Sequence, residues 1–168
     1  MIPTLTWTGE GVRFIDQTRL PLEESYVLAT TYEQVADAIV TMVVRGAPAI
    51  GVSAAYGVAL GAKYTQAATL AEFAPEFERI CARLAATRPT AVNLFWAIDR
   101  MKSLFAQLLG SGATLAQIAT LAQIKERLMA EANAMYDEDI AACKAMGAFG
   151  GALLPNEAGV LTHCNAGA

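Results

Sequence analysis

The chain has 168 residues, of which 55% are hydrophobic and 17% are charged, and this length is typical of one domain with a buried core. Its net charge of −4 and its scattered Lys and Arg residues argue against nucleic acid as a main partner, and no run reaches the ~18 to 20 uncharged apolar residues of a membrane span. Three scattered cysteines exclude a disulfide scaffold, and an N-terminus without a signal-peptide pattern favours a cytoplasmic protein with no membrane contact.

The first thirty residues contain short β-prone runs. They lie near residue 7 and over residues 12–16 and 26–29, and glycines, Pro21 and charged residues separate them. This pattern predicts a small antiparallel β meander over about residues 5–30.

Helical spacing of apolar residues begins near residue 31. Thr30 and Glu33 have the spacing of a capping box, and the first helix must stop before Arg45. Its inward face is expected to include Met42. Pro48 can open a second helix at its first position, where a missing N–H costs nothing. The segment after Pro48 is apolar all round up to residue 62, which predicts burial on most sides.

Three more helical patterns follow, up to about residue 148. The third helix is expected to hold Pro75 in its first turn and to bury Cys81. The fourth has an apolar stripe that includes Phe95. A second capping-box candidate, Thr114 with Gln117, precedes about thirty residues that fit one long helix or two abutting ones, with Cys143 at a core position.

The last stretch differs from the rest. Residues 159–164 form a mostly apolar run before a turn-prone Asn-Ala-Gly-Ala, which is how a parallel α/β unit begins. Such a strand needs neighbours, so we expect the sequence to stop at the threshold of a second domain. The predicted organisation is an α-rich domain with a β meander over residues 1–150, then a linker and the first strand of a truncated Rossmann-like domain over residues 151–168.

Two arginines occupy similar settings. Arg45 precedes Gly46-Ala47-Pro48, and Arg88 precedes Pro89, each just before a predicted helix. Helix N-termini favour anions, the guanidinium fork suits phosphate or carboxylate, and Gly46 lets an anion approach the backbone. Each stretch alone is a weak signal, and on spacing alone two surface arginines at loop–helix junctions are the better explanation.

Cys164 lies at the carboxyl end of the last predicted strand, where open α/β sheets place their ligands. Its thiol there suits an acid, a base or a nucleophile, and a small buried hydrophobe is the alternative. His163, the only histidine, should face the opposite way, so the two do not form one dyad. The chain clusters too few N, S and O ligands for a metal site.

Three stretches together carry a resemblance. They are RGAPAIG at residues 45–51, TRPTAVNL at residues 87–94 and VLTHCNAGA at residues 160–168. In this order, and over essentially the whole chain, they closely resemble the family of methylthioribose-1-phosphate isomerases of methionine salvage. Relatives of that family include ribose-1,5-bisphosphate isomerases and the non-catalytic regulatory subunits of eukaryotic initiation factor 2B.

The resemblance implies a mainly α fold with a small N-terminal antiparallel β meander, and the start of a Rossmann-like α/β domain at the C-terminal end. It implies an isomerase that converts 5-methylthioribose 1-phosphate to 5-methylthioribulose 1-phosphate, as a homodimer without metal or cofactor. Within that family's motifs, Arg45, Gly46, Ala47 and Arg88 fall on substrate-binding positions, and Cys164 falls on the catalytic cysteine. The family's acidic partner, an aspartate, falls beyond residue 168, so we expect a truncated chain that is inactive alone.

Two alternatives remain at this point. A ribose-1,5-bisphosphate isomerase would need a second anion site in place of an apolar pocket for the methylthio group. A non-catalytic regulatory subunit need not keep Cys164 together with Arg45 and Arg88, and this chain has all three.

Overall fold

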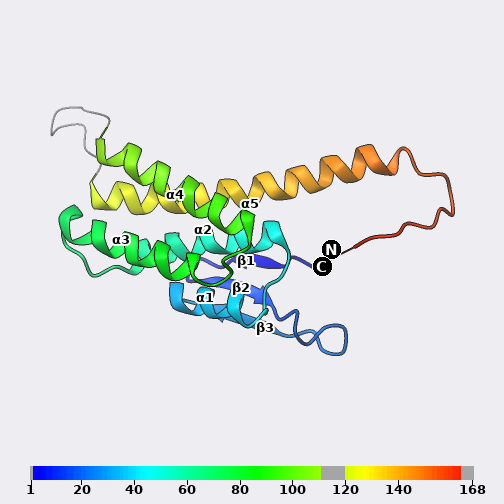
Figure 1. Cartoon of the computed structure of the whole chain (residues 1–168), viewed down its shortest axis with the longest axis horizontal. Helices are drawn as coiled ribbons and strands as arrows, with labels where there is room; N and C mark the ends of the chain where they lie inside the picture. Colours follow the sequence, from blue (N-terminus) through cyan, green and yellow to red (C-terminus); the bar gives the residue numbers. More distant parts are fainter. Residues whose placement is uncertain (1, 111–119, 164–168) are drawn as a thin grey trace.

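The computed structural model describes residues 2–110 and 120–163. In this part of the chain a three-stranded antiparallel sheet precedes five α-helices (Figure 1). The strands are β1 (Leu5–Trp7), β2 (Val12–Ile15) and β3 (Tyr26–Ala29), in the spatial order β1-β2-β3. The predicted β meander and the mainly α character are confirmed.

The N-cap of helix α1 (Tyr32–Val40) lies one residue later than predicted. Thr31 and Gln34 form the capping box, not Thr30 and Glu33, because Gln34 reaches back to the backbone of the preceding turn. The helix ends at Val40, and Met42 lies beyond it with φ 65° and a half-exposed side chain. Met42 therefore does not belong to the inward face of the helix, contrary to prediction.

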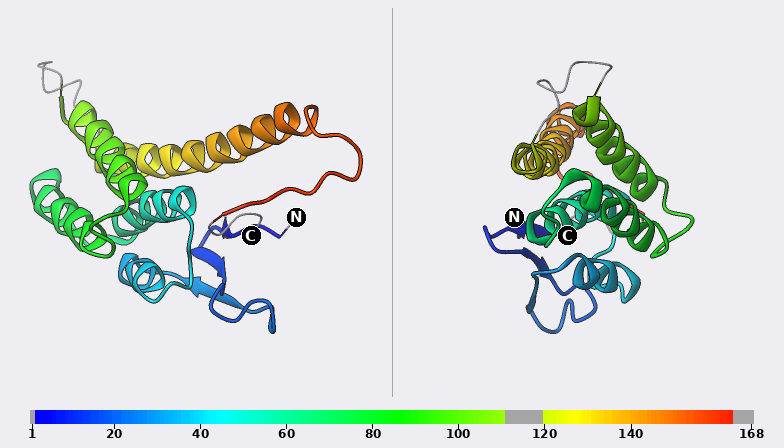
Figure 2. Two further views of the ribbon diagram at one scale, coloured as in Figure 1. Left: turned by 45° about the vertical axis from the view of Figure 1, so that its right-hand side comes forward. Right: turned by 90° about the vertical axis from the view of Figure 1, so that its left-hand side faces the viewer.

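Helix α2 (Ala47–Tyr64) is the centre of the molecule. It packs against α1, α3, α4 and α5, and every residue from 50 to 62 is buried, which confirms the prediction from its all-round apolar sequence (Figure 2). Gly46 is its N-cap, so Pro48 is its second residue and not its first. Small residues allow this central position: a Cβ built on Gly61 would lie 2.5 Å from Ile80 Cδ1.

Helices α3 (Leu70–Ala85) and α4 (Val92–Gly110) cover one side of α2. Thr69 and Glu72 cap α3, which puts Pro75 one turn later than predicted, inside the helix. Cys81 is buried as expected. On α4 the predicted stripe is confirmed at Leu94, Ile98 and Met101, which are buried. Phe95 is 37% exposed, contrary to prediction, and Phe105 is buried farther along the helix.

Helix α5 (Leu121–Gly151) is one continuous helix, capped by Thr120 and Gln123. The predicted cap of Thr114 and Gln117 lies outside the described residues. The first half of α5 packs on the bundle through Tyr56, whose hydroxyl donates to Asn133 Oδ1 over 2.9 Å, and through Arg100 of α4, which pairs with Glu131 at 2.5 Å.

The second half of α5 leaves the body of the molecule (Figure 1). Every residue from 141 to 163 is exposed, and this includes Cys143, which was expected at a core position. A helix of 31 residues extends about 46 Å, beyond the shorter helices that it packs on. The helical spacing of apolar residues thus continues past the end of the surface that α5 packs against.

Residues 159–163 form no strand, although an apolar run predicted one there. A strand is stabilised by hydrogen bonds to a neighbouring strand, and in the described part of the chain the three strands of the meander pair only with one another.

No helix in residues 2–110 and 120–163 is long and apolar enough to cross a membrane.

Candidate functional site

Arg45, Gly46 and Ala47 lie where the chain enters the central helix. Gly46 adopts φ 98°, a left-handed conformation that favours glycine, and it is the N-cap of α2. No side chain caps this end of the helix. The first turn of α2 therefore presents backbone N–H groups and the positive end of the helix dipole without a side-chain acceptor, as an anion site requires.

One residue holds Arg45 at both its main chain and its side chain. The Arg45 backbone N–H donates to Gln17 Oε1 over 2.7 Å, and Arg45 Nη2 donates to the Gln17 carbonyl oxygen. Arg45 is partly buried, and its Nε is buried without a hydrogen-bond acceptor in the described structure. Arg45 forms no ion pair within residues 2–110 and 120–163.

Arg88 lies in the connection between α3 and α4, in neither helix nor strand, as predicted. The connection is ordered at both ends: the Thr87 hydroxyl donates to the Leu84 carbonyl over 2.6 Å, and the Ala91 N–H donates to the Arg88 carbonyl over 3.0 Å. The Arg88 side chain is partly exposed, and it too lacks a carboxylate partner among the described residues.

The two arginine motifs touch each other through their backbones. Gly51 is the last residue of RGAPAIG, and a Cβ built on it would lie 2.8 Å from the carbonyl oxygen of Asn93, in TRPTAVNL. Only a glycine permits this approach. The contact sets the second turn of α2 against the first turn of α4, so the starts of both helices lie on one side of the bundle (Figure 2).

The third predicted stretch is only partly described. Cys164 lies outside the described residues, and His163 is exposed. The other two thiols lie elsewhere: Cys143 is exposed on α5, and burial raises the pKa of Cys81 to about 12, which keeps that thiol protonated and unreactive. The described residues contain no group of three or more His, Cys, Asp and Glu side chains placed to hold a metal ion.

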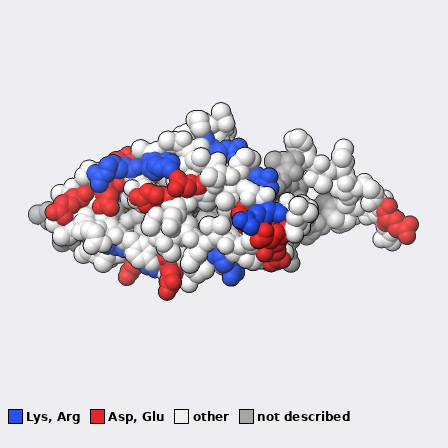
Figure 3. Space-filling view, turned by 90° about the horizontal axis from the view of Figure 1, so that it is seen from below, with Lys and Arg blue, Asp and Glu red and all other residues white. Residues whose placement is uncertain are grey.

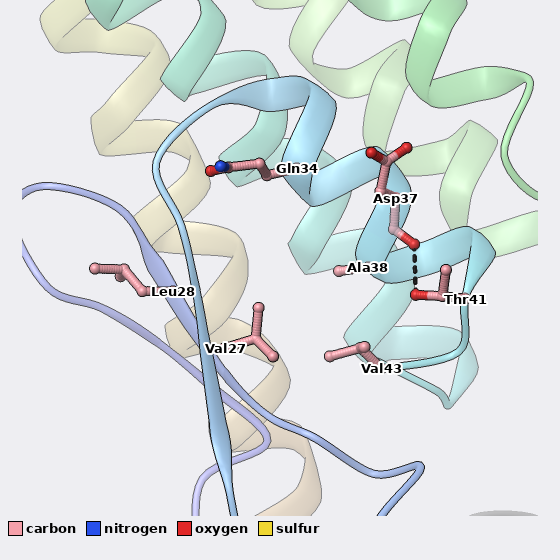
Figure 4. A pocket seen from close by; sticks show the side chains of 7 residues that line it. All are labelled: Val27, Leu28, Gln34, Asp37, Ala38, Thr41 and Val43. Atoms are coloured by element: carbon pink, nitrogen blue, oxygen red, sulfur yellow. Dashed lines mark hydrogen bonds between the residues drawn. The ribbon is translucent and has the colours of Figure 1, made fainter.

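A shallow groove of about 240 Å³ lies elsewhere, between β3 and α1 (Figure 4). Apolar side chains such as Val27 and Leu28 line much of it, and the Thr41 hydroxyl donates to the Asp37 carbonyl at its edge. Its one charged side chain, Asp37, pairs with Arg83 at 2.6 Å. Because no Lys or Arg of the described chain lines this groove, it does not suit an anion, and the arginine motifs remain the better candidate.

The face shown in Figure 3 carries no basic surface that would form a second anion-binding site. Acidic and basic side chains lie side by side there and form no continuous basic area.

Sequence reasoning missed Gln17, because its partner Arg45 lies 28 residues away and no local spacing connects them.

Known proteins similar to this chain include members of an initiation factor family and methylthioribose-1-phosphate isomerases. The initiation factor 2 subunit family matches residues 43–168. Methylthioribose-1-phosphate isomerases from Koribacter versatilis and Geobacter metallireducens are 53% and 51% identical over 168 and 164 residues, which is 100% and 98% of this chain. The chain spans only 45% of each of these relatives.

Solved structures agree with the sequence matches. A crystal structure of 5-methylthioribose 1-phosphate isomerase from Pyrococcus horikoshii OT3 superposes with a TM-score of 0.84 at 39% identity, over 92% of this chain and 41% of that one. Translation initiation factor eIF-2B, subunit delta, from A. fulgidus has a TM-score of 0.80 at 33% identity, over 94% of this chain and 43% of that one.

Proposed function

The chain belongs to the initiation factor 2 subunit family, and from that premise we propose that it forms part of an aldose–ketose isomerase acting on 5-methylthioribose 1-phosphate, with 5-methylthioribulose 1-phosphate as the product. Relatives that are about half identical over the whole chain carry the corresponding name, which supports this reaction over the two alternatives. The proposed setting is methionine salvage in the cytoplasm, with the longer protein acting as a homodimer.

The substrate's chemistry explains why arginines and helix starts suit it. Its anomeric oxygen carries the phosphate, so the sugar ring does not open to a free aldehyde as ordinary aldoses do. The enzyme must bind the phosphate dianion while the ring C–O bond breaks. Arg45 and Arg88 supply guanidinium donors for this, and Gly46 and Ala47 supply backbone at the positive end of α2.

The remaining steps conserve atoms and electrons within the sugar. The ring oxygen gains a proton as its bond to C1 breaks, one hydrogen moves from C2 to C1, and the C2 hydroxyl loses its proton as C2 becomes the ketone. The protons gained and lost balance, so no external oxidant is needed. We assign the hydrogen movement to the neighbourhood of Cys164 and the protonation of the ring oxygen to an acidic residue outside residues 1–168. Positioned acid–base groups contribute about 10²- to 10⁴-fold in rate.

One observation carries the proposal. Two partly buried arginines without ion-pair partners in the described chain stand before two helices, and the second turn of one helix meets the first turn of the other at Gly51 and Asn93. Such an arrangement leaves the cationic donors available to a ligand, and it places uncapped helix N–H groups beside them.

The test uses the chain continued after Ala168 by the remaining residues of the Koribacter versatilis relative. We expect this fusion to convert 5-methylthioribose 1-phosphate to the ketose, measured by NMR of the sugar. Cys164→Ala should lower kcat by about 10²-fold or more, because a positioned group is lost. Cys143→Ala is the matched control, because that thiol is exposed on α5 and should leave kcat unchanged.

A fusion that folds but does not turn over this sugar, beside an active relative, would overturn the proposed reaction. Near wild-type turnover by Cys164→Ala would refute only the role of that thiol. Ribose 1,5-bisphosphate is assayed in parallel, and faster conversion of that sugar would favour the alternative isomerase.

A further inference from the structure

Gln17 is a buried polar residue that neither the motifs nor the family match accounts for. It follows β2, and its side chain is 1% exposed. Its backbone N–H donates to the Val43 carbonyl over 3.0 Å, which ties the β2–β3 loop to the segment just before Arg45. Together with the two bonds from Arg45, three hydrogen bonds join Gln17 to residues 43–45.

These bonds fix Arg45 at two separate points. The Gln17 side-chain oxygen holds the Arg45 backbone, and the Gln17 carbonyl holds one end of the guanidinium. A guanidinium has five N–H donors, and the structure shows an acceptor for Nη2 alone. An arginine whose rotamer is already selected loses less conformational entropy when it binds an anion.

The Gln17 side chain makes one hydrogen bond to Arg45 and leaves one donor without a partner in the described structure. The Gln17 amide nitrogen Nε2 is buried without a hydrogen-bond partner in the described structure, and a buried unsatisfied donor costs about 1–3 kcal/mol. An apolar side chain of similar length would fill the same volume without that cost. What an apolar side chain lacks is the Oε1 acceptor that holds the Arg45 N–H.

We propose that Gln17 is a positioning residue for substrate binding, which orients Arg45 toward the phosphate of the sugar phosphate before the ligand arrives. This inference rests on the proposed function, because it takes Arg45 as a phosphate-binding residue. Gln17 itself does not touch the substrate and acts through Arg45. The residue thus belongs to the binding site although it lies 28 positions earlier in the chain.

The first test reads the order of the Arg45 side chain directly. In the 168-residue chain, the Arg45 Nε–H signal is assigned by its loss in Arg45→Lys, and its ¹⁵N relaxation is measured. Gln17→Met keeps the length and the backbone carbonyl but lacks the Oε1 acceptor of the Arg45 backbone N–H. We expect a rigid signal in the unsubstituted chain and a mobile one in Gln17→Met, because the released Arg45 backbone shifts and Nη2 then no longer meets the Gln17 carbonyl. Gln17→Glu keeps an acceptor oxygen and should keep Arg45 rigid. Gln66→Met is the control, because Gln66 is an exposed loop residue with no contact to Arg45.

The second test uses the fused enzyme described above. Gln17→Met should raise KM for 5-methylthioribose 1-phosphate about five- to tenfold with kcat changed less than twofold, because immobilising a loosened side chain costs binding energy. Gln17→Glu should also raise KM although Arg45 stays rigid, because its carboxylate opposes the phosphate. If Gln17 had only a structural role, the rigidity of the Arg45 side chain and the KM for the sugar phosphate would not respond differently to Gln17→Met and Gln17→Glu.

The outcomes distinguish the two proposals. If Arg45→Met leaves KM unchanged, the proposed phosphate site is wrong. If Arg45→Met raises KM but Gln17→Met does not, the site stands and the positioning role is wrong. If the fused enzyme is inactive, the relaxation data decide: an Arg45 signal equally rigid in Gln17→Met and in the unsubstituted chain overturns the inference.

Discussion

At the residue scale, the arginines that pair with a carboxylate differ from two arginines that are partly buried without one. Arg19, Arg83 and Arg100 each pair with a carboxylate, at 2.8, 2.6 and 2.5 Å. Arg100 bridges α4 and α5, and its hydrogen bonds lower the pKa of Glu138 below its usual value. Arg45 and Arg88 have no such partner in the described chain, although both are partly buried. Partly buried cations without a counter-charge are expected where a ligand supplies it.

This difference gives a prediction for single arginine substitutions. Arg45→Met and Arg88→Met should each weaken sugar-phosphate binding in the fused enzyme by about 1.5–3 kcal/mol, roughly 10- to 100-fold, because a charge-assisted hydrogen bond is lost. Inhibition of the enzyme by inorganic phosphate measures the effect. The control is Arg79→Met, an exposed arginine on α3. Equal inhibition constants for all three variants would contradict the assignment.

At the scale of elements, the contact between α2 and α4 determines how the two motifs meet. Gly51 permits the approach because a Cβ there would lie 2.8 Å from a backbone oxygen, which cannot rotate away. Farther along α2, a Cβ on Gly57 would meet Leu84 Cδ2 at 2.9 Å, the end of a side chain that can shift. The α2–α4 contact is therefore the less tolerant of the two.

Gly51→Ala should consequently destabilise the protein and disturb the site. We expect a loss of about 1–3 kcal/mol in the free energy of unfolding, because overpacking forces the two backbones apart. Phosphate affinity should fall as well. Gly147→Ala is the matched control: nothing lies within 4 Å of its Cβ position on α5, so it should not destabilise the protein. Urea denaturation of both variants measures the difference, and a Gly51→Ala variant as stable as Gly147→Ala would show that the helices are free to separate.

The whole molecule combines a packed bundle with an unpacked helical extension. Residues 50–62 of α2 are buried on all sides, whereas residues 141–163 are all exposed and include Phe149 and Leu153 at 77% and 84%. Helix stability in proteins comes mainly from packing of an apolar face, and short isolated helices are marginal in water. The two halves of α5 should therefore differ in stability although they form one helix.

Hydrogen exchange tests this expectation on the 168-residue chain. Amides of residues 143–151 should exchange orders of magnitude faster than those of residues 50–62, because local opening there disrupts no core contact. Dilution of the sample serves as the control for self-association. Slow exchange that persists on dilution would mean that the second half of α5 is packed in solution, in contradiction to its exposure here.

The sequence predicted the elements well where the signals are local. The three strands, the burial of α2 and the burial of Cys81 on α3 follow from alternation, all-round apolar composition and helical spacing. The same signals failed where a pattern continued without a surface to pack on. Cys143 kept its helical spacing but lies beyond the body, and the apolar run at residues 159–163 has no neighbouring strand in the described part of the chain.

For the candidate site, the sequence by itself determined which residue types stand before the two helices, Arg45 with Gly46 and Arg88 with Pro89. Those features depend on local backbone preferences, so they are readable without a fold. The tertiary structure alone decided that Gly51 meets Asn93 and that Gln17 holds Arg45. Both contacts join segments far apart in the chain, and they form only when the β2–β3 loop and α4 pack against the entry to α2.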